Sequence, residues 1–300
     1  MSGARQPQLG SIQANGISLG FAQWHAELRG REPTLLFVHA TGFHSRVWDQ
    51  LISHLPARHI VAVDQRGHGR SDRTEVTGWQ VFGRDLAAFV AALELRQLVG
   101  VGHSMGAHAL VQAAAIESAR FERLALIDPV IASPAAYHLA PPFAPGQMHP
   151  AAKRQNRFDS PQAMIERFAQ RPPYTIFDPA ALRDYCEHGL LPAPDGDGYE
   201  LACSPQTEAS VYMTGRANAG VYASIRALEI PVLIIRAKLP PPDRNVFDYS
   251  SSPTWPGLVG EFRRAREVHL PERTHFLPME SPAEVAALLR EAMALPAGTP

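Results

Sequence analysis

The stretch LVGVGHSMGAHAL (residues 98–110) decides the fold of this chain. An apolar run of strand length, Leu98 to Val101, leads into Gly102-His103-Ser104-Met105-Gly106, and an alanine-rich helical segment, Ala107 to Ile116, follows directly. In this context the G-x-S-x-G pattern predicts a sharp strand-to-helix turn that exposes the Ser104 hydroxyl at the carboxyl edge of a sheet. The alternative is a glycine-rich turn with an incidental serine. The strand before the turn and the helix after it favour Ser104 as a nucleophile.

Apolar runs of buried-strand length recur on both sides of this stretch, separated by segments with helical periodicity. These runs are Thr34 to Val38, Ile60 to Val63, Leu124 to Ile127 and Val232 to Ile235, and a last strand is expected near Arg266 to Leu270. Continuous apolar strands that alternate with helices predict a mostly parallel sheet with helices on both faces. Two earlier strands, Leu9 to Ala14 and Ile17 to Trp24, are joined by the hairpin signal Asn15-Gly16. We therefore expect an α/β fold built on an eight-stranded sheet.

The alternation of strands and helices stops after Asp128 and resumes at Pro231. The intervening chain is rich in proline and contains three plausible short helices, at 161–170, 179–188 and 206–213. The sequence thus predicts a core made of residues 1–128 and 231–300. Residues 129–230 are predicted to form an inserted helical cap at the active-site edge.

Composition excludes several classes of protein. With 45% hydrophobic and 19% charged residues, the 300-residue chain can bury a sizeable core and is not predominantly disordered. The net charge of −1 without long runs of one sign argues against a nucleic-acid binder. Two cysteines, no signal peptide and no long apolar window predict a soluble, cytoplasmic protein without a membrane span. We expect a small-molecule substrate, no nucleic-acid partner and no metal or organic cofactor, and the chain could form a homodimer.

A serine hydroxyl is a weak nucleophile unless a base accepts its proton. Of the 13 histidines, His275 is the best placed, because it lies between the last strand and the last helix. In a parallel sheet that loop opens on the same carboxyl edge as Ser104. His103 and His108 are close in sequence but are not expected to act as the base, since His103 is the variable residue of the turn and His108 lies one turn into the helix.

Several motifs together resemble the α/β-hydrolase family, in the subgroup whose members carry a helical cap. They are Val38-His39-Ala40-Thr41-Gly42-Phe43 followed by Trp48, Asp64-Gln65-Arg66-Gly67-His68-Gly69-Arg70-Ser71, Gly102 to Gly106, Pro231 to Ile235, and Thr274-His275-Phe276 before Ser281-Pro282. The turn itself aims the N–H group of Met105 and the positive end of a helix at the reacting centre. The resemblance adds the N–H group of Thr41 as the second oxyanion donor, with Ala40 in place of the family's usual glycine.

The acid that orients the histidine is the open member of the predicted triad. In the commonest arrangement of the family it follows the strand after the cap, but that position is Pro240 in this chain. Asp128, at the end of the strand after the nucleophile helix, is an alternative that some members use. Asp243 and Asp248, in the proline-rich loop, are further candidates, and a site without a direct acid is the remaining one.

The predicted function is hydrolysis of a small or medium, largely apolar carboxylic ester through an acyl-enzyme. Substrate is expected to meet Phe43, Met105 and Phe276 from the core, and some of a set of residues from the insertion: Phe143, Tyr174, Phe177, Tyr212 and Met213. Alternatives on the same triad are a carbon–carbon bond hydrolase and a cofactor-free perhydrolase. A non-catalytic ligand receptor is the alternative of a different class. Serine rather than aspartate at position 104 disfavours haloalkane dehalogenases and epoxide hydrolases.

Overall fold

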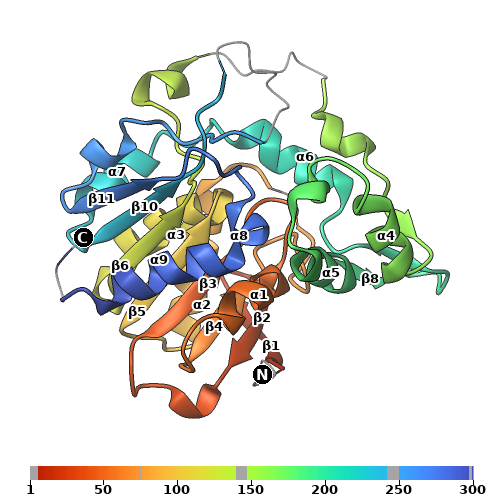
Figure 1. Ribbon diagram of the computed structural model, residues 1–300, viewed down its shortest axis with the longest axis horizontal. Helices are drawn as coiled ribbons and strands as arrows, with labels where there is room; N and C mark the ends of the chain where they lie inside the picture. The colour runs from red at the N-terminus through yellow and green to blue at the C-terminus, as the bar shows by residue number, and fades with distance from the viewer. Residues whose placement is uncertain (1–5, 75, 140–146, 242–249, 297–298, 300) are drawn as a thin grey trace.

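The computed structural model describes residues 6–74, 76–139, 147–241, 250–296 and 299, and its centre is an eight-stranded sheet (Figure 1). The strands follow the spatial order β1-β2-β4-β3-β5-β6-β10-β11. Their bounds are β1 Gln8–Ala14, β2 Ile17–Trp24, β3 Thr34–Val38, β4 Ile60–Val63, β5 Leu98–His103, β6 Phe121–Ile127, β10 Val232–Arg236 and β11 Ala265–His269. The β1–β2 and β2–β4 pairs are antiparallel and all other neighbours are parallel. The predicted α/β fold with a mostly parallel eight-stranded sheet is confirmed.

The antiparallel edge of the sheet begins with the predicted hairpin. Ala14 pairs with Ile17, so Asn15 and Gly16 form a two-residue turn. Their φ angles are 50° and 78°. Positive φ at both central residues is what a type I′ turn requires, and asparagine and glycine tolerate it best.

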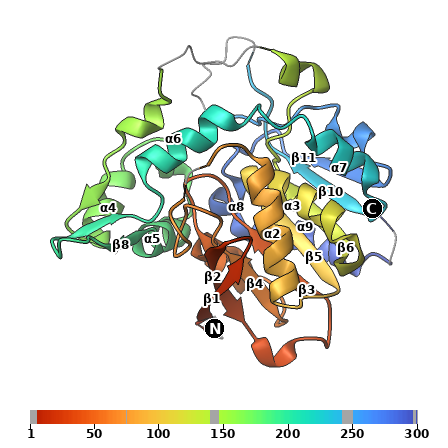
Figure 2. The same ribbon diagram turned by 180° about the vertical axis from the view of Figure 1, so that it is seen from behind.

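Helices cover both faces of the sheet, as the two opposite views in Figures 1 and 2 show. One face carries α2 Gln80–Ala92, α3 Met105–Ile116 and α7 Val221–Ala227, and the other carries α1 Asp49–Ser53, α8 Leu277–Glu280 and α9 Pro282–Ala294. Strand residues alternate between the two hydrophobic layers: Leu36 belongs to the first layer and Phe37 to the second, and both are completely buried. Burial on both faces explains why these strands are continuously apolar in sequence.

The chain between β6 and β10 consists of short elements. They are the 3₁₀ turns η4 Pro134–His138, η5 Pro150–Lys153 and η6 Tyr174–Ile176, the helices α4 Pro161–Phe168, α5 Pro179–His188 and α6 Pro205–Thr214, the strands β7 Arg157–Phe158, β8 Leu190–Pro192 and β9 Tyr199–Leu201, and α7. Helices therefore stand at all three predicted places. The antiparallel sheet β7-β9-β8 was not anticipated, because strands of two or three residues show no alternation. Moreover α7 packs against α3 on the central sheet and not against α4 or α5.

Proline begins three helices of this inserted segment. Pro161, Pro179 and Pro205 each occupy the first helical turn of α4, α5 or α6. The residue before each proline is Ser160, Asp178 or Ser204, whose side chain accepts a hydrogen bond from a backbone N–H group of the first turn. A side-chain cap followed by proline defines a helix start locally, without help from distant packing. Three of the 13 prolines between residues 129 and 230 thus mark where short α-helices begin.

The remaining elements are 3₁₀ turns at chain reversals: η1 Ala26–Leu28, η2 Ser45–Trp48, η3 Ser118–Arg120 and η7 Leu258–Glu261. The predicted last helix is α9, which starts at Pro282 as expected, but the Ser281 side chain makes no capping hydrogen bond. Within the described ranges, no helix is long and apolar enough to cross a lipid bilayer.

Candidate active site

Ser104 lies on the turn between β5 and α3 in a strained backbone conformation, with φ 57° and ψ −118°. The two flanking glycines are required by close packing. A Cβ atom on Gly106 would lie 2.2 Å from the carbonyl oxygen of Val38, and one on Gly102 would lie 2.6 Å from Cα of Ala107. The sheet and helix therefore approach each other so closely that only glycine fits at either position. This packing holds Ser104 in its unfavourable conformation.

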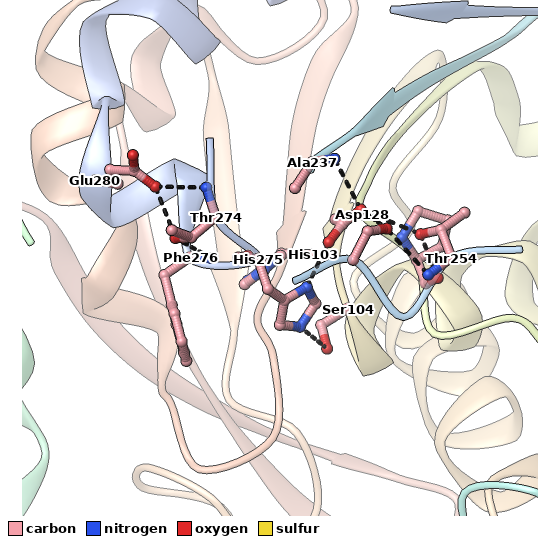
Figure 3. Close-up of polar contacts among 11 residues, drawn as sticks. His103, Ser104, Asp128, Ala237, Thr254, Thr274, His275, Phe276 and Glu280 are labelled. Carbon is pink, nitrogen blue, oxygen red and sulfur yellow. Dashed lines mark hydrogen bonds and ion pairs between the residues drawn. The ribbon is translucent and has the colours of Figure 1, made fainter. Parts of the chain in front are cut away.

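Ser104, His275 and Asp128 form a hydrogen-bonded chain (Figure 3). Nε2 of His275 lies 3.0 Å from Oγ of Ser104, and Nδ1 of His275 lies 2.6 Å from Oδ2 of Asp128. When Nδ1–H donates to the carboxylate, the Nε2 lone pair faces the serine hydroxyl and can accept its proton. All three side chains are buried, and Asp128 is completely so.

Three donors hold the second carboxylate oxygen of Asp128. Oδ1 accepts hydrogen bonds from the Ala237 N–H group at 3.0 Å, the Ser252 hydroxyl at 2.6 Å and the Thr254 hydroxyl at 3.3 Å. A buried carboxylate is costly unless such bonds compensate it. The end of β10 therefore supplies a backbone donor to an acid that comes from β6. Asp243 and Asp248 lie outside the described residues.

Sequence reasoning missed Ser252 and Thr254. The hydroxyl-rich run Ser250 to Thr254 is visible in the sequence, but no spacing rule links it to Asp128, more than 120 residues earlier. The structure also joins this run to the histidine, because the N–H group of His275 donates to the carbonyl of Ser250 at 3.1 Å. One short segment thus contacts two members of the Ser–His–Asp chain.

The loop that carries His275 is fixed from two sides. On one side, the N–H and hydroxyl groups of Thr274 both donate to Glu280, at 2.8 and 2.7 Å (Figure 3). On the other, Nε2 of His103 lies 2.8 Å from the carbonyl oxygen of His275. Burial, together with the neighbouring His275, lowers the pKa of His103 to about 3, so its ring is neutral at ordinary pH and Nε2–H donates. His103 therefore contacts the backbone of His275, outside the Ser–His–Asp chain.

His108 lies in the interior of α3, away from the chain of three residues. Its Nδ1 bonds the carbonyl of Val130 at 3.0 Å and its Nε2 lies 3.1 Å from the amide nitrogen of Asn218. Burial lowers the pKa of His108 to about 4. It is a core histidine with both nitrogens occupied.

The loop after β3 is held by His39. Nδ1 of this residue lies 2.7 Å from the carbonyl of Ala40, and its Nε2 accepts from the N–H group of Gln65 at 3.0 Å. Burial lowers the pKa of His39 well below its usual value, which fits this neutral, doubly bonded ring. In this loop the positive φ, 78°, falls on Gly42, so Ala40 can replace glycine without backbone strain.

Thr41 and Met105, the two predicted oxyanion residues, are in contact. The Thr41 hydroxyl lies 3.4 Å from Sδ of Met105. Thr41 lines the cavity in front of Ser104, and Met105 is the completely buried first residue of α3. The N–H group of Met105 belongs to the first turn of α3, where N–H groups have no hydrogen-bond partner within the helix.

A cavity of about 470 Å³ opens in front of Ser104 and His275. Phe43 and Phe276, both predicted to contact substrate, line it from the sheet side. Of the residues expected from the insertion, the lining includes Tyr174, Tyr212 and Met213. Phe177 is buried behind the wall, with its ring centroid 5.5 Å from that of Phe276, and Phe143 lies outside the described residues. The lining is predominantly apolar.

Charged residues of the inserted segment also line this cavity, and sequence reasoning did not find them. Nη1 of Arg154 pairs with Oε2 of Glu208, and Nη2 donates to the hydroxyls of Tyr174 and Tyr185 at 3.1 and 3.2 Å. Arg216 lines the cavity as well and makes no ion pair within the described part of the chain. Their positions at the cavity result from packing between short elements, and no sequence motif predicts that packing.

Among the described residues, one group of side chains brings three possible metal-ligand atoms close together. Ligand atoms of Asp49, Asp184 and His188 lie within 4.8 Å of one another. Arg46 already donates to both carboxylate oxygens of Asp49, and Gln50 donates to Asp184 at 2.7 Å. These partners satisfy the carboxylates without a metal.

An eight-stranded, mostly parallel sheet with a serine on the turn between β5 and α3 is the architecture of an α/β hydrolase. Residues 35–288 match the sequence model of the alpha/beta hydrolase family, and the chain belongs to that family. Its relatives are named as hydrolases, esterases and lipases, and the protein is a hydrolase.

Two curated relatives illustrate the range of the similarity. The 2-(acetamidomethylene)succinate hydrolase of Mesorhizobium japonicum is 30% identical over 228 residues, which are 74% of this chain and 76% of that protein. Esterase YbfF of Escherichia coli is 34% identical over 80 residues, 27% of this chain and only 30% of the esterase. A crystal structure of E-2-(acetamidomethylene)succinate hydrolase covers 96% of this chain and 100% of its own, with a TM-score of 0.72 and 22% identity. This last likeness shows the shared fold.

Proposed function

We propose that the protein is a serine hydrolase that cleaves a small or medium, largely apolar carboxylic ester through an acyl-enzyme. The observation that carries the proposal is the unbroken hydrogen-bonded chain from Ser104 through His275 to Asp128 at the floor of an apolar cavity. Nucleophile, base and orienting acid are thus at hydrogen-bond distance before any substrate is bound.

In this mechanism Oγ of Ser104 attacks the ester carbonyl while Nε2 of His275 accepts the hydroxyl proton. His275 then gives this proton to the departing alkoxide. In the second step His275 accepts a proton from a water molecule that attacks the acyl-enzyme, and returns it to Oγ of Ser104. Asp128 keeps the imidazole in the tautomer that the first step needs. The N–H groups of Thr41 and Met105 stabilise the negative charge that develops on the carbonyl oxygen.

The cavity supports an apolar substrate of limited size. Its volume of about 470 Å³ lies in the range of small-molecule sites, and Phe43 and Phe276 present aromatic surface next to Ser104. Residues 129–230 are proposed to act as a cap, since Tyr212 and Met213 close the cavity opposite the sheet.

Ser104→Ala tests the nucleophile. In a chain-length series of p-nitrophenyl esters, we expect this variant to lose several orders of magnitude in kcat, because triad members act as a unit. The exposed Ser53→Ala in α1 is the matched control and keeps wild-type rates. Near wild-type turnover by a folded Ser104→Ala variant would refute the proposal. Mass spectrometry after treatment with a fluorophosphonate separates enzyme from receptor: one label on Ser104 supports an activated nucleophile, and an unlabelled folded protein supports a receptor.

Arg216 favours a second candidate, an acid-bearing substrate. The relative from Mesorhizobium japonicum is named for a succinate derivative, and Arg216 is a cavity cation without an ion-pair partner among the described residues. Turnover of 2-(acetamidomethylene)succinate, measured beside p-nitrophenyl butyrate, distinguishes the candidates. If the acid is the better substrate, Arg216→Gln raises KM for it and leaves KM for the neutral ester unchanged.

A further inference from the structure

A second cavity, of about 390 Å³, lies on the inserted segment and is lined by residues of η5, α4 and η6 and by residues that adjoin these elements. We call it the basic cavity. Its charged lining residues are Lys153, Arg154, Arg167 and Arg171, and Phe168 and Tyr174 contribute aromatic surface. No carboxylate lines it within the described ranges. The positions of the four cations are scattered over 19 residues of sequence, so the fold and not a charge run brings them together.

Three of these cations have no partner among the residues that the structure describes. The side chains of Lys153, Arg167 and Arg171 are exposed and form no hydrogen bond or ion pair with any described residue. The neighbouring Arg157 behaves differently, since it pairs with both Asp195 and Glu200. Acids are therefore available in this part of the molecule, but they are used outside the basic cavity.

The fourth cation is held rigidly in the cavity wall. Arg154 is fixed by Glu208 and by the hydroxyls of Tyr174 and Tyr185, so its guanidinium does not swing out into solvent. Tyr174 in turn stacks on Phe168, with ring centroids 4.2 Å apart and an angle of 9° between the planes. Even when Glu208 is counted against Arg154, the three remaining cations leave the basic cavity with an excess of positive charge.

We propose that the basic cavity binds a small multivalent oxyanion, one that bears phosphate groups or several carboxylates. Several cations around one concave site repel one another in the empty protein, and a multivalent anion removes that repulsion. Arginine forms charge-assisted, often bidentate hydrogen bonds with both oxyanion types. The volume accommodates a small molecule and not a macromolecule.

The basic cavity is separate from the proposed catalytic residues but adjoins their cavity. Arg154 and Tyr174 line both cavities and form part of the wall between them. An anion in the basic cavity would therefore lie behind the substrate pocket without touching Ser104 or His275. Its binding does not depend on the proposed ester hydrolysis.

Calorimetric titration of the full chain with inorganic pyrophosphate and, separately, with citrate tests this proposal at fixed ionic strength in sodium chloride. We expect saturable binding of at least one anion, weakened as salt increases. Binding of pyrophosphate alone identifies phosphate as the recognised group, and binding of citrate alone identifies carboxylates. Absence of binding by both anions overturns the proposal.

The variant Arg167→Gln/Arg171→Gln locates the site. Both side chains are exposed, so the fold should persist, and we expect affinity to fall about tenfold or more. Arg96→Gln/Arg226→Gln is the matched control, because it removes two exposed arginines elsewhere in the molecule and changes net charge equally. Figures 1 and 2 place α7, which carries Arg226, at the opposite end of the molecule from α4. Equal losses in both double variants would show nonspecific charge attraction and contradict the site.

Discussion

The sheet and the inserted segment are stabilised by different kinds of contact. In the sheet, every strand except the edge strand β1 has at least one neighbour far away in sequence, and Leu36 and Phe37 are buried on opposite faces. In the inserted segment, the longest helices have 10 residues, and the three strands have two or three. Helix caps and side-chain pairs such as Arg154–Glu208 stabilise these short elements. Strands that pair over a long range are therefore recognisable in the sequence as continuous apolar runs. Local caps show where a helix starts, but not how the helices pack against one another.

The division also separates the groups at the active-site cavity. Ser104, His275 and Asp128 all stand at ends of strands of the central sheet or in loops directly after them. The charged lining residues Arg154 and Arg216 both come from the inserted segment. We propose that the sheet supplies the chemistry and that the inserted segment selects the substrate.

Asp128→Asn gives the largest expected effect and tests whether the acid belongs to the sheet. We expect kcat for an ester to fall about 10⁴-fold, or about 5.5 kcal/mol, because asparagine stabilises the wrong histidine tautomer. Asp243→Asn, at a position beyond β10 in sequence, is the control and should retain activity. Steady-state kinetics of both variants decide between the two positions, since a large loss in Asp243→Asn alone would move the acid to the loop.

Gly106→Ala and Gly196→Ala compare packing in the two regions. A Cβ on Gly106 would overlap the backbone carbonyl of Val38, so we expect a loss of about 4 kcal/mol or more in unfolding free energy. Gly196, in the turn between β8 and β9, has φ 78° and open space around it. Its replacement costs about 1 kcal/mol, from backbone strain alone. Urea unfolding measures both, and equal losses would break the contrast between the regions.

Ser252→Ala tests whether the hydroxyl bonded to Asp128 positions the acid. Loss of this hydrogen bond should cost about 1–2 kcal/mol, equivalent to a fall of roughly 5–30-fold in kcat. KM should stay unchanged, because Ser252 does not line the cavity. A change in KM without a change in kcat would contradict a positioning role, and Ser53→Ala again serves as the control.

The pH dependence of stability reflects buried histidines of the sheet region. Burial lowers the pKa of His44 and of His103 to about 3, whereas the unfolded chain titrates near 6.5. Between these values the unfolded state binds more protons, so stability falls as pH decreases below about 6.5. Each such histidine contributes a slope of up to about 1.4 kcal/mol per pH unit. Urea unfolding at pH 7.5, 6 and 5 checks this, and a flat profile would contradict it.

The sequence predicts most of the sheet region for identifiable physical reasons. Strands such as Thr34–Val38 and Ile60–Val63 have the predicted bounds, because burial on both faces demands uninterrupted apolar residues. Ser104 and His275 stand at hydrogen-bond distance because parallel strands end at one edge. The hydroxyl donors around Asp128 were not predictable, since Ser252 lies 124 residues from Asp128 in sequence and no motif links the two.

Other features escaped prediction because they arise from packing between short elements. The β7-β9-β8 sheet has strands too short for a periodic signal. The Arg154–Glu208 pair joins residues 54 positions apart that no motif connects. The division of the chain into residues 1–128, 129–230 and 231–300 stays a prediction, and the packing of α7 on α3 shows that the last part of the inserted segment contributes to the sheet's own helical layer.

The position of Asp128 at the end of β6 has a consequence for how this chain can change over evolutionary time. Ser104 and Asp128 bracket a single helix–strand unit, from α3 to β6, so an insertion or deletion elsewhere does not alter the 23 residues between them. A hydrogen bond of 2.8 Å from the N–H group of Ser252 to the carbonyl of Lys238 helps to hold the hydroxyl-rich run beside Asp128. With Asp128 as the proposed acid, the sequence after β10 is released from supplying a carboxylate at a fixed position. We expect this sequence to vary in length and composition while the proposed acid is inherited together with the proposed nucleophile.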